Sequence, residues 1–317
     1  MKKILALLMA CLFVLSFAAA FAESEKTLTI VCTTFPQYDW VRQILGDRVN
    51  DVDLTLLLDN GVDLHSYQPT ADDIFRIAQC DLFIYTGGES DSWVDDVLAT
   101  AQSSDRKTVN LLERVEAKRE ETVEGMQEEH DEDDHASEAE YDEHVWLSLR
   151  NAEVLTQSIA DVLCQLDPAH AAAYQENARN YIAQLSDLDD QYKDAVNNGA
   201  RTTILFADRF PFRYLADDYG LTYYAAFVDC SAETEASFET IAFLTRKVDE
   251  LKLPVVLTIE GDDSSIAETV VASTQEKNQQ ILAMNSLQSV TEADIADGES
   301  YLSIMTENLK ILKEALD

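Results

Sequence analysis

Five histidines are the residues of this chain best suited to hold a metal ion, and two of them stand in informative places. His65 lies in residues 61–70 (GVDLHSYQPT), after a β-rich run, and His144 lies in residues 142–148 (DEHVWLS). A neutral imidazole binds zinc well, and carboxylate oxygens can complete a tetrahedral shell. A single histidine after a strand is more often a hydrogen-bonded structural residue. The sequence around these two histidines must therefore show whether they are metal ligands.

Two further histidines lie in a strongly acidic stretch. From Glu120 through Glu143 there are thirteen Asp or Glu residues and no Lys or Arg. Such a segment cannot bury enough apolar surface to offset its ordering entropy, so residues 119–143 are expected to form a disordered loop. His130 and His135 within it can hold zinc weakly and raise its local concentration. The alternative is a solvated, charged linker in which the histidines are incidental.

The elements that must position these residues alternate between short β-rich runs and longer helical runs, as in parallel β-α-β units. The expected strands are 28–33, 52–58, 82–85, 202–206, 223–227, 254–259 and a short piece near Ile281, and the expected helices are 38–45, 72–78, 92–101, 238–251, 265–274 and 301–315. Residues 151–195 read as helical nearly throughout, with an interruption near Pro168. The sequence therefore predicts an α/β protein of two lobes with parallel central sheets, joined by one long helix, with a ligand between the lobes.

The N-terminus has the pattern of a secretory signal peptide. Lys2 and Lys3 precede the apolar run 4–22, which ends in Ala-Phe-Ala. A membrane anchor is the alternative, and residues 8–11 resemble a weak lipoprotein box that would place a lipid on Cys11. The expected divisions are a signal peptide (1–22), an N-terminal lobe (23–150), a helical link (151–196) and a C-terminal lobe (197–317). The chain is expected to be exported, to the periplasm or the outer cell surface.

Composition narrows the class of partner. The formal net charge is −37, which argues against a nucleic-acid partner bound through its phosphates. Acidity fits a cation as partner, although it often serves only solubility. After signal removal Cys32, Cys80, Cys164 and Cys230 remain, and their spacing matches no zinc–thiolate pattern. Four cysteines allow three full pairings, between which the sequence does not choose.

The stretches around His65 and His144 resemble the metal-binding solute-binding proteins of ABC transporters, the zinc and manganese cluster. The resemblance rests on residues 33–36 (TTFP), on 61–70 against the motif G-x-D-x-H-x-Y-x-P-T, on 85–93 (YTGGESDSW), and on 142–148 against D-P-H-x-W-L-S. The motifs occur in the order of the family over nearly the whole mature chain. By this resemblance, His65 and His144 are metal ligands from the first lobe.

The second lobe departs from the family pattern. The family places its third ligand, His or Glu, after the first strand of that lobe, in a context like H-D-A-F-x-Y-F. Here residues 206–214 (FADRFPFRY) are one or two residues longer and contain no histidine, so Ala207, Asp208 or Arg209 falls at the ligand position. Asp208 is the candidate because it alone can coordinate zinc. The alternative is that Asp208 pairs with Arg209 or Arg213, or caps the next helix.

The fourth ligand of the family is Asp or Glu in a loop after the last strand, where this chain has Gln288. An amide is a poor zinc ligand, so we expect water there, with Gln288 hydrogen-bonded beside it. Glu260 ends the strand 254–259 and points toward the same cleft by topology. It is expected either to bind the metal or to orient a ligand through a hydrogen bond.

The resemblance implies zinc as the bound ion, because zinc members of the family carry acidic, histidine-containing loops. Zinc tolerates three protein ligands and a water, whereas manganese prefers six, mainly oxygen, ligands. The expected function is high-affinity zinc binding outside the cytoplasm by a monomer, with delivery to an ABC permease driven by its ATPase, and no enzymatic activity. A manganese-binding homologue and a surface adhesin or metal buffer are the alternatives. A zinc hydrolase is disfavoured because no His-Glu-x-x-His spacing supplies a general base.

Overall fold

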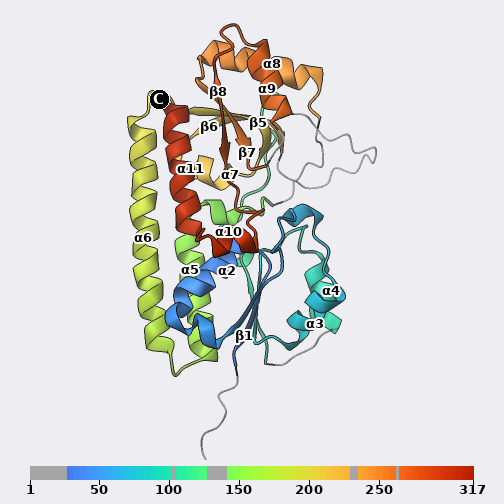
Figure 1. Cartoon of the computed structure of the whole chain (residues 1–317), viewed down its shortest axis with the longest axis vertical. Helices are drawn as coiled ribbons and strands as arrows, with labels where there is room; N and C mark the ends of the chain where they lie inside the picture. The colour runs from blue at the N-terminus through green and yellow to red at the C-terminus, as the bar shows by residue number, and fades with distance from the viewer. Residues whose placement is uncertain (1–26, 101–104, 127–140, 229–234, 262–263) are drawn as a thin grey trace, which may run out of the picture.

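The protein forms two lobes, each built on a four-stranded parallel sheet (Figure 1). The computed structural model describes residues 27–100, 105–126, 141–228, 235–261 and 264–317. The first sheet has the order β2-β1-β3-β4 and the second the order β6-β5-β7-β8. Their bounds are β1 (Thr29–Cys32), β2 (Asp53–Leu56), β3 (Leu82–Tyr85), β4 (Lys107–Asn110), β5 (Thr203–Phe210), β6 (Thr222–Val228), β7 (Val255–Ile259) and β8 (Gln280–Met284). The α/β class and the two-lobe architecture predicted from the sequence are confirmed.

Helices cover the sheets and join the lobes. They are α2 (Phe35–Leu45), α3 (Ala71–Gln79), α4 (Trp93–Thr100), α5 (Leu149–Leu166), α6 (Ala171–Asn198), α7 (Arg213–Tyr219), α8 (Phe238–Leu251), α9 (Ser265–Ser273), α10 (Glu292–Ala296) and α11 (Tyr301–Leu316). The chain leaves the first lobe through α5, turns near Pro168 and enters the second lobe through α6, which is 28 residues long. Helix α6 runs along one side of both lobes with α11 beside it (Figure 1). No helix in the described ranges is both long and apolar enough to cross a membrane.

The long helix buries one face against the rest of the protein. Tyr174, Ala178, Tyr181 and Leu185 recur at steps of four, three and four residues and are all buried. Further along the helix, the buried Tyr192 hydroxyl donates to the carbonyl of Met305 in α11 at 2.7 Å. One continuous apolar core contains residues of both sheets together with α5, α6 and α11. A second, smaller core lies among β5, β6, β7, α8 and α9.

Short or polar elements were missed by the sequence patterns. Strand β4 has one fully buried side chain, Val109, and helices α7 and α10 are short. None of the three therefore shows a hydrophobic pattern long enough to be recognised in the sequence. Helix α2 begins at Phe35 rather than at residue 38, because Gln37 Oε1 accepts from the Thr34 amide at 3.4 Å and Pro36 suits the first turn. Strand β5 continues to Phe210, beyond the expected end at residue 206.

The acidic stretch is more ordered at its described ends than expected. Arg119 and Tyr141 form an isolated antiparallel bridge, and Met126 is buried. The amide of Asp142 also donates to the carbonyl of Lys118 at 2.9 Å. The expectation of disorder is therefore wrong for residues 119–126 and 141–143. Backbone pairing stabilises an ordered conformation there, which the charged side chains alone would not. Residues 127–140, with His130 and His135, lie outside the described residues.

Candidate metal centre

His65 and His144, 79 positions apart in the sequence, are neighbours in space. His65 lies in the 3-10 turn η3 (Leu64–Ser66) after β2, and its amide donates to Asp63 Oδ1 at 2.9 Å. His144 immediately precedes a second 3-10 turn, η5 (Val145–Leu147). The two ring centroids are 5.4 Å apart. This pairing of the two histidines is the core of the candidate centre.

His144 is held by the residue two positions before it. The carboxylate of Asp142 accepts from the His144 amide at 2.8 Å and lies 3.1 Å from Nδ1 of the ring. Because an ionised carboxylate only accepts, this contact favours the tautomer with the proton on Nδ1, which leaves the Nε2 lone pair for a metal ion. The side chain is fully buried, and its ring packs edge-on against Trp146 with centroids 5.1 Å apart.

His65 is held by groups that the sequence patterns did not single out. Its Nδ1 lies 2.8 Å from the hydroxyl of Ser90, in the turn after β3. Oε2 of Glu143 lies 4.0 Å from the same ring nitrogen, and the His65 side chain is 15% exposed. The sequence carried one signal for Glu143, because it stands where the family motif quoted above has proline. Ser90 lies within the motif of residues 85–93, but its role depends on the fold of the turn.

A second buried carboxyl lies behind this turn. Asp91 Oδ2 accepts from the amides of Thr86 and Gly87 at 2.8 and 2.9 Å. Burial raises the pKa of Asp91 to about 7, and the nearby charge of Glu143 adds to the shift, whereas the two amide hydrogen bonds oppose it. The first-lobe side of the candidate centre therefore holds two close carboxyl groups in a desolvated environment.

The segment that carries His144 is anchored to the second lobe. The Tyr214 hydroxyl in α7 donates to the Asp142 carbonyl at 2.9 Å, and Trp146 Nε1 donates to the carbonyl of Ser286 at 2.8 Å. The Tyr301 hydroxyl in α11 donates to the Trp146 carbonyl at 2.6 Å. Trp146 thus joins the two lobes.

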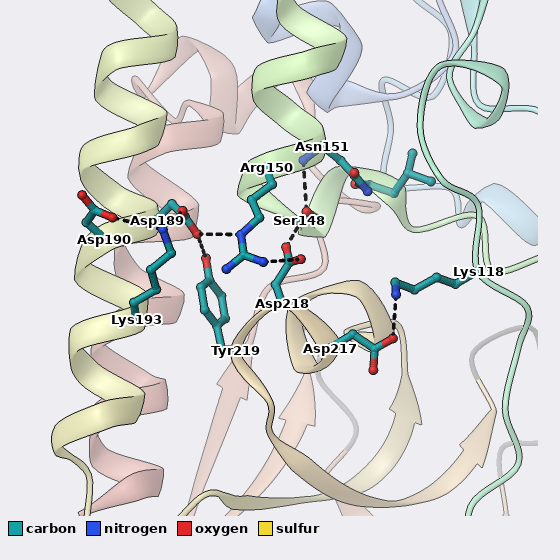
Figure 2. A network of polar contacts seen from close by, with 11 residues as sticks. Lys118, Ser148, Arg150, Asn151, Asp189, Asp190, Lys193, Asp217, Asp218 and Tyr219 are labelled. Atoms are coloured by element: carbon teal, nitrogen blue, oxygen red, sulfur yellow. Dashed lines mark hydrogen bonds and ion pairs between the residues drawn. The ribbon is translucent and has the colours of Figure 1, made fainter.

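A polar network continues this anchoring at the start of α5 (Figure 2). Ser148 caps α5 by accepting from the Asn151 amide at 3.0 Å, and its hydroxyl donates to Asp218 Oδ2 at 2.5 Å. Arg150 lies 3.4 Å from Asp218 and 3.7 Å from Asp189 of α6. The network therefore ties the turn after His144 both to α7 of the second lobe and to the long helix.

Asp208 lies in an irregular part of β5, where the pairing with β6 shifts register between Phe206 and Arg209. Such a bulge inserts chain without lengthening the strand, which explains the extra residues that blurred the family alignment. Asp208 accepts from the amides of Arg209 and Ile259 at 2.8 and 3.2 Å. Burial raises the pKa of Asp208, and those two amides oppose the shift.

The side chain of Arg209 reaches across to the first lobe. Its guanidinium lies 2.9 Å from Asp63 Oδ2, and the other oxygen of Asp63 accepts from the His65 amide. Arg209 is thus bonded to Asp208 through its backbone amide, while its guanidinium pairs with Asp63. This cross-lobe ion pair places a cation beside the loop of His65.

Glu260 and Gln288 lie together with a serine-rich loop after β8. Glu260 accepts from the Ser286 amide at 2.7 Å, from the Ser286 hydroxyl at 2.6 Å and from the Ser289 hydroxyl at 2.9 Å. Gln288 is buried, and its Oε1 has no hydrogen-bond partner among the described residues. Glu260 therefore organises the loop that carries Gln288.

The described residues contain no group of three His, Cys, Asp or Glu side chains arranged closely enough to hold a metal ion. The structure thus brings His65 and His144 together and leaves the contribution of Asp208 or Glu260 a prediction. The loop histidines His130 and His135 lie outside the described residues. What the arrangement offers is a pair of oriented imidazoles with the first-lobe carboxylates of Asp142 and Glu143 beside them, which suits a borderline cation such as zinc.

Known proteins resemble this chain in sequence and in structure. The family model described as "Zinc-uptake complex component A periplasmic" matches residues 30–315. The zinc-binding lipoprotein AdcA of Streptococcus pneumoniae (strain ATCC BAA-255 / R6) is 32% identical over 322 residues, which cover 100% of this chain and 62% of that protein. The chain thus spans about three fifths of that relative's length.

In two further comparisons the match covers nearly the whole length of the other protein. The high-affinity zinc uptake system protein ZnuA of Bacillus subtilis (strain 168) is 29% identical over 305 residues, covering 94% of this chain and 90% of that protein. The crystal structure of the Zn(II)-bound ZnuA-like domain of Streptococcus pneumoniae AdcA matches with a TM-score of 0.73 and 29% identity, covering 92% of this chain and 100% of that domain. With the two-lobe fold and the paired histidines, these matches show that the chain belongs to the family of the periplasmic component A of zinc-uptake complexes.

Proposed function

We propose that this chain binds zinc outside the cytoplasm and delivers it to the permease of an ABC transporter with its ATPase. The observation that carries the proposal is the 5.4 Å approach of the His65 and His144 rings, with a carboxylate on the Nδ1 side of each. Family membership and the zinc-bound relatives support zinc as the ion. In this proposal residues 1–22 are a signal peptide; the alternative is cleavage before Cys11, with a lipid on Cys11 that would keep the protein at the membrane surface.

We further propose Asp208 as the third ligand. Burial is the main reason that the pKa of Asp208 is raised, and the charge of Glu260 adds a smaller contribution; a cation bound to Asp208 would favour its charged form. Glu260 already accepts three hydrogen bonds, which suits an orienting role better than coordination. A water completes a tetrahedral shell in this proposal, with the buried Oε1 of Gln288 as its acceptor.

Calorimetric titration of the mature protein with zinc and with manganese near neutral pH tests the proposal. We expect one tight zinc site per chain and a loss of affinity of more than about 100-fold in His65→Ala and in His144→Ala. Removing a ligand should cost more than the 10- to 100-fold typical of groups that only hydrogen-bond to ligands. Asp208→Asn should weaken zinc binding more than Glu260→Gln does.

The matched control is His170→Ala, because His170 pairs with Asp167 at the start of α6 rather than with the candidate centre. A chain with His130 and His135 both replaced by alanine separates capture by the acidic stretch from binding in the centre. Weak binding at several sites that His65→Ala leaves unchanged would contradict the proposal. Tighter binding of manganese than of zinc would favour the manganese-binding alternative.

A further inference from the structure

Glu143 is a buried carboxylate with one oxygen directed toward a histidine of the candidate centre. The residue is 1% exposed. Its Oε1 accepts from the Ser90 amide at 2.9 Å. Its Oε2 lies 4.0 Å from His65 Nδ1 and has no hydrogen-bond partner among the described residues. Burying a carboxylate oxygen costs free energy unless it faces positive charge, so a cationic group beside Oε2 would stabilise it.

The turn after β3 is shaped around this carboxylate. A Cβ atom added to Gly88 would lie 2.2 Å from Glu143 Oε1, and Gly88 has a φ of +84°, which favours glycine. The same turn supplies the Ser90 amide to one oxygen of Glu143 and the Ser90 hydroxyl to His65. One short turn therefore fixes both the carboxylate and the imidazole beside it.

The Ser90 hydroxyl alone does not choose the tautomer of His65, because a hydroxyl can either donate or accept. The negative charge of Glu143, on the same side of the ring, favours one tautomer of His65. A proton on Nδ1 presents the positive end of the N–H bond to the carboxylate, whereas a lone pair there would be repelled. A cation bound at Nε2 makes the ring more positive and strengthens this attraction further.

We propose that Glu143, acting with Ser90, holds His65 with its proton on Nδ1, so that the Nε2 lone pair is presented to zinc and the affinity of the site rises. Glu143 is thus a positioning residue, matching the role of Asp142 at His144. The inference rests on the proposed zinc site for its effect on affinity, but its effect on the tautomer exists in the metal-free protein.

Nuclear magnetic resonance of protein labelled with nitrogen-15 in its histidines tests the tautomer directly. At about pH 8, where an ordinary imidazole is neutral, His65 should carry its proton on Nδ1. The signals are assigned by comparison with His65→Ala. In Glu143→Gln, which keeps an acceptor for the Ser90 amide but removes the charge, His65 should become a mixture of tautomers. The His144 signals, governed by Asp142, should stay unchanged and serve as the internal control.

Zinc titration provides the second readout. Glu143→Gln should weaken binding by about 10-fold or more, as expected for loss of a group that orients a ligand. Glu143→Asp, which keeps the charge, should retain more of the affinity. Glu314→Gln, an exposed site on α11, is the matched control and should bind as the unchanged protein does. Unchanged affinity in Glu143→Gln, together with an unchanged tautomer of His65, would overturn the inference.

Three outcomes separate this inference from the proposed function. Absence of tight zinc binding in the unchanged protein overturns the proposed function, while the tautomer measurement still decides the role of Glu143. His65 protonated on Nε2 in the metal-free, unchanged protein overturns the inference without need of any variant. A zinc-loaded structure with Glu143 bound directly to the ion also overturns it, because the residue would then be a ligand.

Discussion

At the scale of single residues, the chemistry of the candidate centre is decided by what contacts the Nδ1 side of each imidazole. Asp142 lies 3.1 Å from Nδ1 of His144, and Ser90 lies 2.8 Å from Nδ1 of His65. Both arrangements direct Nε2 away from these groups. In the proposed site the ligands are imidazoles, so protons compete with zinc for the same nitrogen atoms.

Zinc affinity should therefore decrease as the pH decreases. Histidine side chains take up a proton between about pH 5 and 8, so we expect much weaker zinc binding at about pH 5.5 than at about pH 7.5. Competition with a chelator of known affinity at each pH measures this difference. Equal affinities at the two pH values would mean that the histidines are not the ligands.

Asp91 predicts a pH dependence of stability. Its pKa is raised to about 7 in the folded protein, so the folded state holds this proton more tightly than the unfolded state does. The associated stability is fully present below about pH 4 and is lost as the pH rises through about 7. At about 1.4 kcal/mol for each pKa unit, the effect is a few kcal/mol at most.

Asp91→Asn removes this proton equilibrium, so the variant should gain stability relative to the unchanged protein between about pH 4 and pH 8. Urea unfolding at several pH values gives the difference in the free energy of unfolding. Asp187→Asn, at an exposed site on α6, controls for the general loss of a negative charge. A pH-independent difference for Asp91→Asn would show that this carboxyl titrates normally.

At the scale of elements, the turn η5 is the piece on which both lobes meet. It follows His144 directly, and its Trp146 is bonded to α11 and to the loop after β8, while Asp142, two residues before His144, is bonded to α7. The bulge in β5 lies on the side of the second lobe that meets the first, because Arg209 at the end of the bulge forms an ion pair with Asp63. The geometry of the centre therefore depends on contacts between elements that are distant in sequence.

Tyr214→Phe tests this anchoring. The Tyr214 hydroxyl accepts from the Lys118 amide and donates to the Asp142 carbonyl, each at 2.9 Å. Its removal leaves two backbone groups without this partner, so we expect a loss of about 1–3 kcal/mol in the free energy of unfolding. Urea denaturation measures the loss. Tyr38→Phe, at a half-buried site in α2, is the control and should cost less.

At the scale of the whole molecule, the lobes are joined by more than the chain that links them. A single apolar core runs through both, helix α6 spans them, and the Arg209–Asp63 ion pair bridges them. A shared core and a stiff helix oppose the large hinge closure that flexible strand connections allow.

The overall dimensions should accordingly change little on zinc binding. We expect small-angle X-ray scattering to give the same radius of gyration for the metal-free and the zinc-loaded protein within error. Rearrangement should be confined to the loops that carry His65 and Gln288 and to the bulge of β5 that carries Asp208. A clear decrease in the radius of gyration with zinc would contradict a rigid interlobe core.

The arrangement of strands and helices followed from local patterns that act over a few residues. The expected strand 82–85 and the expected helix 238–251 coincide with β3 and α8, because each has a clear period and clear ends. Strand β4 and helices α7 and α10 lacked such a period, and their positions depend on packing against other elements. The ordered ends of the acidic stretch likewise depend on backbone pairing across a long separation in sequence.

By itself, the sequence determined the α/β class and the two lobes, and its family motifs made His65 and His144 the candidate ligands, since hydrophobic periods and short motifs are local properties of the chain. Only the tertiary structure decided that Glu143 and Ser90 face His65, that Arg209 pairs with Asp63, and that Glu260 is engaged by Ser286 and Ser289. The physical reason is that charge and hydrogen bonding act through space. Their partners come from loops whose mutual approach is set by the packing of both lobes rather than by spacing along the chain.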